Sequence, residues 1–272
     1  MKEAKMKIWG SLRRIAALSI VALGVQATAA QAQDYKLLEP GTLKCAFTGA
    51  FAPFSMQTSD GKWYGLTNEV FREMANRTGL KLEYVITKWD SLLVGLMADQ
   101  YDILCDTMDI TKERQARVLF VDGWIESGGR LVVHKDSDIT SFDQFKGKTM
   151  GVLVSSTWAV LAKGLEPGET KYYQAESDAM RDLADKKIDG MVTDSIAAAW
   201  AAEHTKMPLR TVDGYLSRIQ KGWAAKKDRA ELVKALNKAL AEMVADGTYA
   251  KLTKALIGYS PAPAEPIRSQ LN

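Results

Sequence analysis

The residues with the most suggestive chemistry lie at positions 106–114, where two acids precede an arginine. We expect Thr111 to cap a short helix, so that Arg114, one turn further on, points toward the opening left by the loops of neighbouring strands. A guanidinium can bind a carboxylate through two parallel hydrogen bonds. Asp106 and Asp109 would add negative charge to the same opening. An arginine on a helix is also commonly a surface residue, and this alternative stays open.

A second polar pair, Ser156 and Thr157, follows the apolar segment 151–154 and should open another helix. The backbone N–H and the hydroxyl of Thr157 could face an anion from there. Simple N-capping explains the pair equally well. Trp89, together with the two acids named above, favours a cationic or zwitterionic ligand over a purely anionic one.

Several common catalytic motifs are absent from the sequence. It contains no GxGxxG dinucleotide loop, GxxxxGK[ST] phosphate loop, GxSxG nucleophile elbow or HExxH zinc motif. His134 and His204 are isolated, so we expect no metal site and no cofactor. Carboxylates are plentiful, but in a protein of this size most of them are solvated at the surface. We therefore predict that the protein is not an enzyme.

The first 32 residues have the composition of a secretory signal peptide. Basic residues precede an apolar run at 15–25, and Ala30-Gln31-Ala32 provides a small-x-small cleavage site before Gln33. The run is too short for a comfortable membrane span, and Arg13-Arg14 leaves Sec and twin-arginine export open. We expect a mature periplasmic protein that begins near Gln33.

Removal of this segment changes the charge balance of the chain. It carries five of the 36 basic residues and one of the 33 acidic residues, which leaves 31 basic against 32 acidic residues. The apparent basic character therefore belongs to the export signal. We expect no nucleic-acid partner and no binding to an anionic membrane surface.

Cys45 and Cys105 are the only cysteines, and both lie in short apolar segments that read as strands. A disulfide is compatible with an exported protein. Cysteine is also among the residue types most often buried as a free thiol, and we expect two buried thiols rather than a bridge. The sequence does not decide between these alternatives.

Strand-like and helix-like segments alternate from Leu43 onward, which predicts an α/β fold with parallel sheets covered by helices. An amphipathic helix is expected from Thr67 to just before Gly79. Another is expected over 230–244, where apolar residues recur at steps of three and four. The proline-rich tail at 260–272 should be mobile.

Four segments of the chain, in their order along the sequence, resemble segments of the family 3 solute-binding proteins of bacterial amino-acid uptake. The most specific is MDITKER, within the segment YDILCDTMDITKERQARVLF, and KALNKALAEMVADGTYAKL is a strong second. GTLKCAF and FAPF near the start of the mature chain complete the match. The resemblance covers the chain from about Gly41 to Gly258. It implies the periplasmic binding component of an ABC importer, which captures an amino acid or a similar small molecule and delivers it to a membrane permease.

The family also implies a fold and a set of domain boundaries. Its members have the two-lobed type II periplasmic-binding-protein fold, with two Rossmann-like lobes joined by two crossing strands that close on the ligand as a hinge. By resemblance, lobe 1 is 33–126 plus 220–272 and lobe 2 is 127–219. Glycines near the crossings would suit a hinge, although ordinary turns explain them as well. We expect a monomer.

The resemblance assigns roles to individual residues of the site. Arg114 matches the arginine that binds the ligand carboxylate, and Asp194 matches the carboxylate that accepts the ligand ammonium. N-capping of the helix that follows is an alternative role for Asp194. Further candidate contacts are the aromatic pair that would flank the ligand side chain and the hydroxyl residues around it. These are Phe51, Trp89, Thr107, Ser156 and Thr157.

Two positions depart from the family pattern. Asp109 stands where members usually have a serine or threonine that touches the ligand carboxylate, and Thr48 stands where many have an aspartate. Either Asp109 turns away to cap the next helix, or the ligand is not a simple α-amino acid. Cyclohexadienyl or arogenate dehydratases resemble this family too. An enzyme of that kind is the alternative function, and it would need a positioned general acid.

Overall fold

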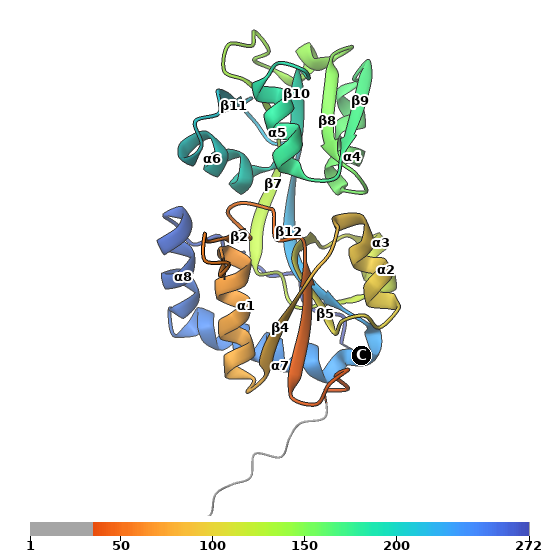
Figure 1. Cartoon of the computed structure of the whole chain (residues 1–272), viewed down its shortest axis with the longest axis vertical. Coiled ribbons are helices and arrows are strands. Elements are labelled where there is room, and N and C mark those ends of the chain that lie inside the picture. The colour runs from red at the N-terminus through yellow and green to blue at the C-terminus, as the bar shows by residue number, and fades with distance from the viewer. Residues whose placement is uncertain (1–34, 272) are drawn as a thin grey trace, which may run out of the picture. The chain divides into compact units, whose positions relative to one another are not determined.

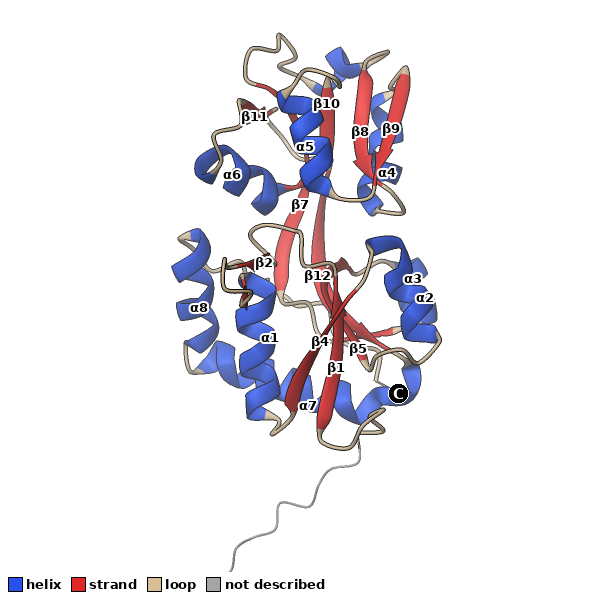
Figure 2. Cartoon of the chain, in the orientation of Figure 1, coloured by secondary structure: helices blue, strands red, loops and turns tan. Residues whose placement is uncertain are grey.

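The computed structural model describes residues 35–271 of the chain. The expected signal peptide and its cleavage site lie outside the described residues. Helices and strands alternate along the chain in two groups, each of which surrounds its own part of a mixed sheet (Figures 1 and 2). The predicted α/β class is confirmed.

The first group lies in the lower half of Figure 1 and contains the first and last elements of the chain. Its strands are β1 (Thr42–Phe47), β2 (Met56–Gln57), β3 (Trp63–Tyr64), β4 (Lys81–Ile86), β5 (Ile103–Asp109) and β6 (Leu119–Phe120), and its helices are α1 (Leu66–Arg77), α2 (Leu92–Met97), α3 (Lys112–Arg117), α7 (Ala230–Ala245) and α8 (Thr248–Ile257). The two amphipathic helices expected near 67–79 and 230–244 are therefore confirmed as α1 and α7.

The second group contains the middle of the chain. Its strands are β8 (Thr149–Leu153), β9 (Glu169–Tyr173), β10 (Gly190–Asp194) and β11 (Leu209–Thr211), and its helices are α4 (Thr157–Ala162), α5 (Glu176–Ala184) and α6 (Ser195–His204). Within it β8 pairs in parallel with both β9 and β10, whereas β11 is antiparallel to its neighbour.

Two long strands connect the groups, β7 (Ile125–His134) and β12 (Ser217–Ala225) (Figure 1). They pair antiparallel from Ser217 opposite Gly129 to Lys221 opposite Ile125. The sheet order β4-β1-β5-β12-β7-β10-β8-β9 places these two strands at its centre. The chain therefore crosses between the groups twice, as the resemblance implied.

Glycines on the connecting strands are required by close packing rather than by an unusual backbone conformation. A β-carbon at Gly128 would lie 2.1 Å from the Ser217 carbonyl oxygen, and one at Gly222 would lie 2.9 Å from the Val121 carbonyl oxygen. Neither glycine has a positive φ angle. A larger residue at Gly128 would push β7 and β12 apart, and one at Gly222 would push β12 away from the segment that follows β6, so the glycines have a steric cause.

Each group of elements has its own hydrophobic core. In the first, the indole rings of Trp124 and Trp223 stack 4.3 Å apart between α1 and α7 and stand beside Tyr249 of α8. In the second, Phe145 and Trp158 pack with the aliphatic residues of β7 and β8. Burial of this apolar surface stabilises each group and so supports the loops between them.

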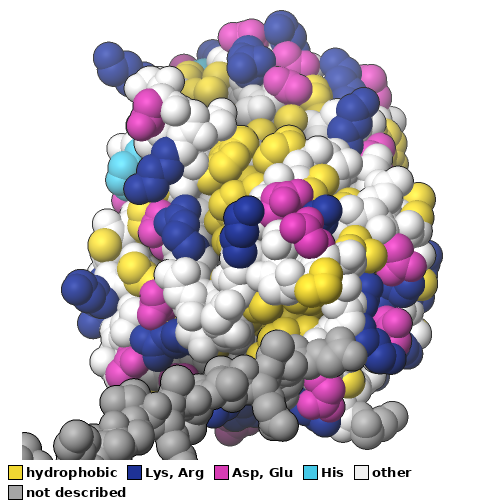
Figure 3. All heavy atoms as spheres, turned by 60° about the horizontal axis from the view of Figure 1, so that its bottom comes forward, with side chains coloured by type: hydrophobic (Ala, Val, Ile, Leu, Met, Phe, Trp, Pro, Cys, Tyr) yellow, Lys and Arg dark blue, Asp and Glu magenta, His cyan; other side chains and the backbone are white. Residues whose placement is uncertain are grey.

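Acidic and basic side chains are interspersed over the face shown in Figure 3, and neither sign dominates the part of it that is visible. Among the described residues, no helix has the length and apolar character needed to cross a bilayer.

The C-terminal tail is held in place by hydrogen bonds, so the prediction that it is mobile is wrong. Ser269 donates its backbone N–H to Asp122 at 2.7 Å and its hydroxyl to the Phe120 carbonyl at 2.6 Å. Gln220 on β12 donates to the Glu265 carbonyl and accepts from the Ile267 N–H. The sequence could not indicate this because the partners lie far from the tail along the chain.

Cys45 and Cys105 form a disulfide that joins β1 to β5, with their Cα atoms 5.5 Å apart. The expectation of two buried thiols is wrong. β1 and β5 are adjacent parallel strands, and this neighbour relation places the two side chains within bonding distance.

Replacing both cysteines by alanine should reduce the free energy of unfolding by about 4 kcal/mol, because the bridge closes a long loop in the unfolded chain. The two cysteines are separated by 60 positions. Urea denaturation of the wild type and of the Cys45→Ala/Cys105→Ala variant measures the difference. A reducing agent should lower the midpoint of the wild type and leave that of the variant unchanged. Equal midpoints for the two proteins without reductant would contradict the prediction.

Candidate functional site

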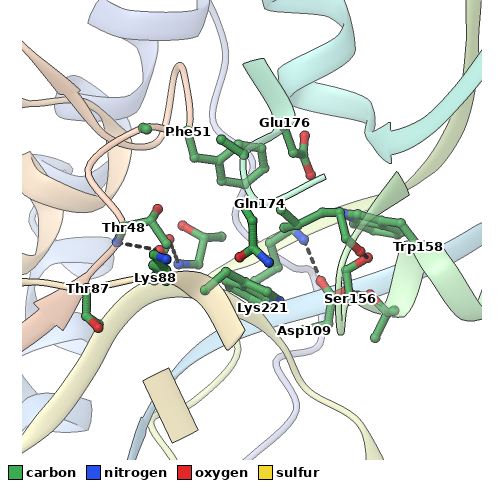
Figure 4. A pocket seen from close by; sticks show the side chains of 17 residues that line it. Thr48, Phe51, Thr87, Lys88, Asp109, Ser156, Trp158, Gln174, Glu176 and Lys221 are labelled. Carbon is green, nitrogen blue, oxygen red and sulfur yellow. Dashed lines mark hydrogen bonds and ion pairs between the residues drawn. The ribbon is translucent and has the colours of Figure 1, made fainter. Parts of the chain in front are cut away.

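A cavity of about 260 Å³ lies where the two groups of elements meet, beside the connecting strand β12 (Figure 4). Its walls are formed at the carboxyl ends of the parallel strands β1, β4, β5, β8 and β9. The lining residues come from the last part of these strands or from the segments that follow them. This is the edge at which α/β sheets bind small molecules, because the chain leaves each strand there in a loop with free side chains.

Seven of the nine residues predicted for the site line this cavity. They are Phe51, Trp89, Asp106, Thr107, Asp109, Ser156 and Thr157. Thr48, the second departure from the family pattern, also lines it. Sequence reasoning missed six further lining residues with polar, charged or aromatic side chains, namely Thr87, Lys88, Trp158, Gln174, Glu176 and Lys221.

Arg114 and Asp194 do not line the cavity. Arg114 donates from Nη1 to the Asp109 carbonyl oxygen at 3.0 Å, and its guanidinium lies 5.7 Å from the centre of the Trp89 ring. Burial lowers the pKa of Arg114, although the nearby carboxylates of Asp109 and Glu113 oppose the shift. A guanidinium remains charged even so. It lies directly behind a wall of the cavity and keeps further N–H donors.

Asp194 serves as the N-cap of α6, the alternative role considered from the sequence. Its Oδ1 accepts the backbone N–H of Ile196 at 2.8 Å, while its Oδ2 accepts the Ser127 hydroxyl at 2.6 Å and pairs with Lys221. The side chain is completely buried. Its part in ligand binding stays a prediction.

Asp109 does not cap α3, because Thr111 fills that position and accepts the Arg114 N–H at 3.2 Å. The Asp109 carboxylate instead forms an ion pair with Lys221 Nζ at 2.5 Å and accepts a hydrogen bond from the Thr157 hydroxyl. The acid that departs from the family pattern is therefore neutralised by a lysine from β12.

Lys221 is the charged residue that the sequence analysis failed to identify. Its side chain is almost fully buried, and its ammonium lies 4.8 Å from the centre of the Trp158 ring. The available signal was its setting. The segment from Lys221 to Ala225 is apolar apart from this lysine, and a lysine at the start of the buried part of a strand needs an anionic partner.

Asp106 lies deeper on β5 and is held by backbone groups. The Asp106 carboxylate accepts the backbone N–H of Thr48 at 2.9 Å and that of the adjacent Thr107 at 2.8 Å. Burial raises the pKa of Asp106, while these hydrogen bonds and the charge of Lys221 act in the opposite direction. The Thr107 hydroxyl shares a hydrogen bond with Thr67 at 2.6 Å, which orients it in the wall of the cavity.

The aromatic side chains give the cavity its apolar walls. Phe51 stacks on Phe54 with ring centres 4.7 Å apart, so its ring is supported from the core side. Trp89 Nε1 donates to the Ser155 carbonyl oxygen at 3.4 Å, a contact between the two groups of elements. With Trp158 these rings leave room for a flat or aliphatic portion of a ligand.

Glu176 is the second charged residue that the sequence did not reveal. It begins α5, is buried, and accepts a hydrogen bond from the Thr193 hydroxyl. Burial raises its pKa to about 8, with Asp194 and Asp109 adding to the shift and Lys221 opposing it. At neutral pH this carboxyl is therefore mostly protonated and can act as a hydrogen-bond donor.

The sequence and the structure of the chain are similar to those of known solute-binding proteins. The family described as bacterial extracellular solute-binding proteins, family 3, matches residues 43–259. The histidine-binding periplasmic protein of Escherichia coli (strain K12) is 32% identical over 88% of this chain and 95% of its own length. An ancestral arginine-binding protein bound to glutamine has a TM-score of 0.75 at 31% identity, covering 81% of this chain and 99% of that one.

A third similar structure is the crystal structure of the ancestral amino acid-binding protein AncCDT-1, a precursor of cyclohexadienyl dehydratase. It has a TM-score of 0.75 at 29% identity, covering 80% of this chain and 96% of that chain. These structures have the type II periplasmic-binding-protein fold, and the predicted two-lobed α/β fold is confirmed.

The raised pKa of Glu176 predicts that stability falls with rising pH. Between about pH 4.5 and 8 the folded protein keeps a proton that the unfolded chain loses, so folding becomes less favourable as pH rises through this window and levels off above it. Relative to Glu176→Gln, the wild type should lose on the order of 3 kcal/mol between pH 5 and pH 8. Urea unfolding at several pH values measures this. Parallel profiles for the two proteins would contradict it, and the exposed Glu242→Gln serves as the control.

Proposed function

Because the chain belongs to family 3 of the bacterial extracellular solute-binding proteins, we propose that it captures an amino acid or an amino-acid-like small molecule for an ABC importer. The observation that carries the proposal is a cavity walled by charged, hydroxyl and aromatic side chains from both groups of elements. The chain also matches its relatives over nearly their whole length. In this role it delivers the ligand, as a monomer, to a membrane permease.

The capture mechanism follows from the two connecting strands. We take lobe 1 as residues 33–126 plus 220–272 and lobe 2 as residues 127–219, with β7 and β12 as the hinge. Rotation at these strands would open and close the cavity around a ligand. Two hydrogen bonds already link the lobes across it, from Thr157 to Asp109 and from Trp89 to the Ser155 carbonyl.

Within this cavity the proposed contacts combine charge and shape. Arg114 supplies a guanidinium for the ligand carboxylate after a small shift of the Trp89 ring that covers it. Phe51 and Trp89 flank the ligand side chain, and the hydroxyls of Thr107 and Ser156 are polar contacts at the edge. A buried carboxylate must meet charge, and the arginine is the group placed to provide it.

The second candidate function is a dehydratase on the same scaffold. It is favoured by one observation, the protonated and buried Glu176 in the cavity wall, since such an enzyme needs a general acid. We propose the binding function in preference because the named relatives are binding proteins. Arogenate added to the protein should remain intact. Its conversion to an aromatic product, abolished in Glu176→Gln, would establish the enzyme instead.

The proposed cellular location is the periplasm. The basic, apolar and small-residue order of positions 1–32 supports export and cleavage. Relatives such as the histidine-binding protein are named as periplasmic proteins.

Replacing Arg114 by alanine should weaken ligand binding by about 30-fold or more. Truncating one member of a buried charge pair typically costs about 2–5 kcal/mol. A thermal-shift screen against amino acids, polyamines, betaines and opines first identifies a ligand, and titration calorimetry then measures its affinity for each variant. Arg114→Lys should also bind weakly, because an ammonium cannot form two parallel hydrogen bonds.

Arg117→Ala is the matched control, since Arg117 is exposed on the same short helix. It should bind as the wild type does. If Arg114→Ala binds within about twofold of the wild type, the proposed carboxylate contact is wrong.

Export predicts a defined N-terminus. When the full chain is expressed in a Gram-negative host, osmotic shock should release, without detergent, a protein that begins near Gln33. N-terminal sequencing of the released protein tests this. An Ala30→Arg/Ala32→Arg variant should keep its signal segment, because the cleavage site requires small residues. Recovery of Met1 on the released wild-type protein would overturn the prediction.

A further inference from the structure

Two buried carboxylates stand at one end of the cavity, and donors from within the protein already occupy both. Asp109 lines the cavity, and its two oxygens bind Lys221 Nζ and the Thr157 hydroxyl. Asp194 lies just behind. Its oxygens bind the first N–H groups of α6, the Ser127 hydroxyl and Lys221. Neither carboxylate is left as an unpaired anion that would attract a cation from the ligand.

The cation that these carboxylates share is an ammonium of the protein itself. Lys221 Nζ lies 2.5 Å from Asp109 Oδ1 and 3.1 Å from Asp194 Oδ2. Burial opposes its charge, but the two carboxylates together hold its pKa above the ordinary value for lysine. Lys221 is therefore a charged group in the wall of the cavity, between one acid from each lobe.

An ammonium has three N–H donors, and the two acids account for two of them. Within residues 35–271 no third hydrogen bond to Lys221 Nζ is formed. The ammonium also lies 4.8 Å from the centre of the Trp158 ring, and both residues line the cavity, so we assign its remaining donor to an acceptor on a ligand. A free ligand ammonium at the same point would meet a like charge and no unpaired acid.

We propose that Lys221 takes the place of a ligand ammonium, so that the protein selects carboxylates bearing an oxygen acceptor or an acylated nitrogen on the adjacent carbon. This inference rests on the proposed function and specifies its ligand class. The ligands that fit are 2-hydroxy acids, 2-oxo acids and N-acylated amino acids. In each of them the group next to the carboxylate carries no positive charge and offers an oxygen to Lys221.

The other acids of the cavity do not restore an ammonium site at this end. Asp106 lies three residues before Asp109 on β5, roughly 10 Å along the strand. A cation bound there would belong to another part of the ligand. The Glu176 carboxyl accepts a hydrogen bond from the Thr193 hydroxyl. Because this carboxyl is mostly protonated at neutral pH, it can also donate a hydrogen bond. Lys88, also in the wall, adds positive charge.

The test compares matched ligands by titration calorimetry on the mature chain. Each set consists of an L-amino acid and its 2-hydroxy, 2-oxo and N-acetyl counterparts, with aromatic, amide and cationic side chains represented. The wild type should bind at least one counterpart tenfold or more tightly than the amino acid of the same set. Lys221→Met should reduce this preference at least tenfold, because it frees Asp109 and Asp194 to accept a ligand ammonium.

A second variant guards against misfolding of the first. Lys221→Met leaves two buried acids without their cation, whereas Asp109→Asn/Lys221→Met removes one charge of each sign and keeps similar side-chain shapes. It still removes the positive charge of Lys221 from the cavity wall, so it should shift the preference in the same direction. Lys226→Met is the matched control. Lys226 pairs with the half-exposed Asp99 outside the cavity, and its loss should leave the preference unchanged.

The outcomes separate this inference from the function on which it rests. Tighter binding of free amino acids than of their counterparts by the wild type would overturn the role of Lys221 and support amino-acid capture. An unchanged preference in a folded Lys221 variant would also overturn it. If the wild type binds no member of any set, both the ligand class and the proposed function are wrong. If both Lys221 variants fail to fold, the preference of the wild type alone decides.

Discussion

A lysine ammonium buried at the centre of the molecule is the constraint on which the rest of the site depends. Moving an ion out of water costs several kcal/mol, so Lys221 is tolerated only with anions at hydrogen-bond distance. Asp109 comes from the end of β5, Asp194 from the end of β10, and the lysine from the strand that runs between them. The charge at this end of the cavity therefore depends on an ion cluster that contains one acid from each lobe.

This pairing gives a physical account of the acid at position 109. An isolated carboxylate there would repel the carboxylate of a ligand, which made the residue difficult to reconcile with the family pattern. Lys221, which also pairs with Asp194, offsets the charge of Asp109, and the Thr157 hydroxyl completes the hydrogen bonding. A change at one position of the site is therefore balanced by a residue more than a hundred positions away.

The scaffold holds these groups in place by covalent and steric means. The Cys45–Cys105 disulfide joins β1 to β5, the strand that carries both Asp106 and Asp109, so these acids project from a cross-linked strand. On the connecting strands, Gly128 allows the Ser217 carbonyl to approach closely. Rigid strands with a few mobile connections suit a site that must keep its geometry while the lobes rotate.

Local patterns in the sequence were sufficient for the α/β class, the positions of α1 and α7, and part of the cavity wall. Periodicity and motif order are short-range properties, and the loops after parallel strands converge on one edge of a sheet in any fold of this kind. Ser156 and Thr157 could be named on that basis, whereas Phe51 and Trp89 were named from the family resemblance. The resemblance assigned Arg114 to the ligand carboxylate, and the structure places its guanidinium behind the cavity wall rather than in it.

Only the tertiary structure decided which partner each charged or reactive group has. The Cys45–Cys105 bridge depends on β1 and β5 being neighbours, and the ion cluster depends on Asp109, Asp194 and Lys221 meeting at the crossing of the chain. The raised pKa of Glu176 likewise depends on burial between elements that are distant in sequence. Residue types and local spacing determine what a side chain can do. Its partner and its solvation are set by long-range packing, which no local pattern records.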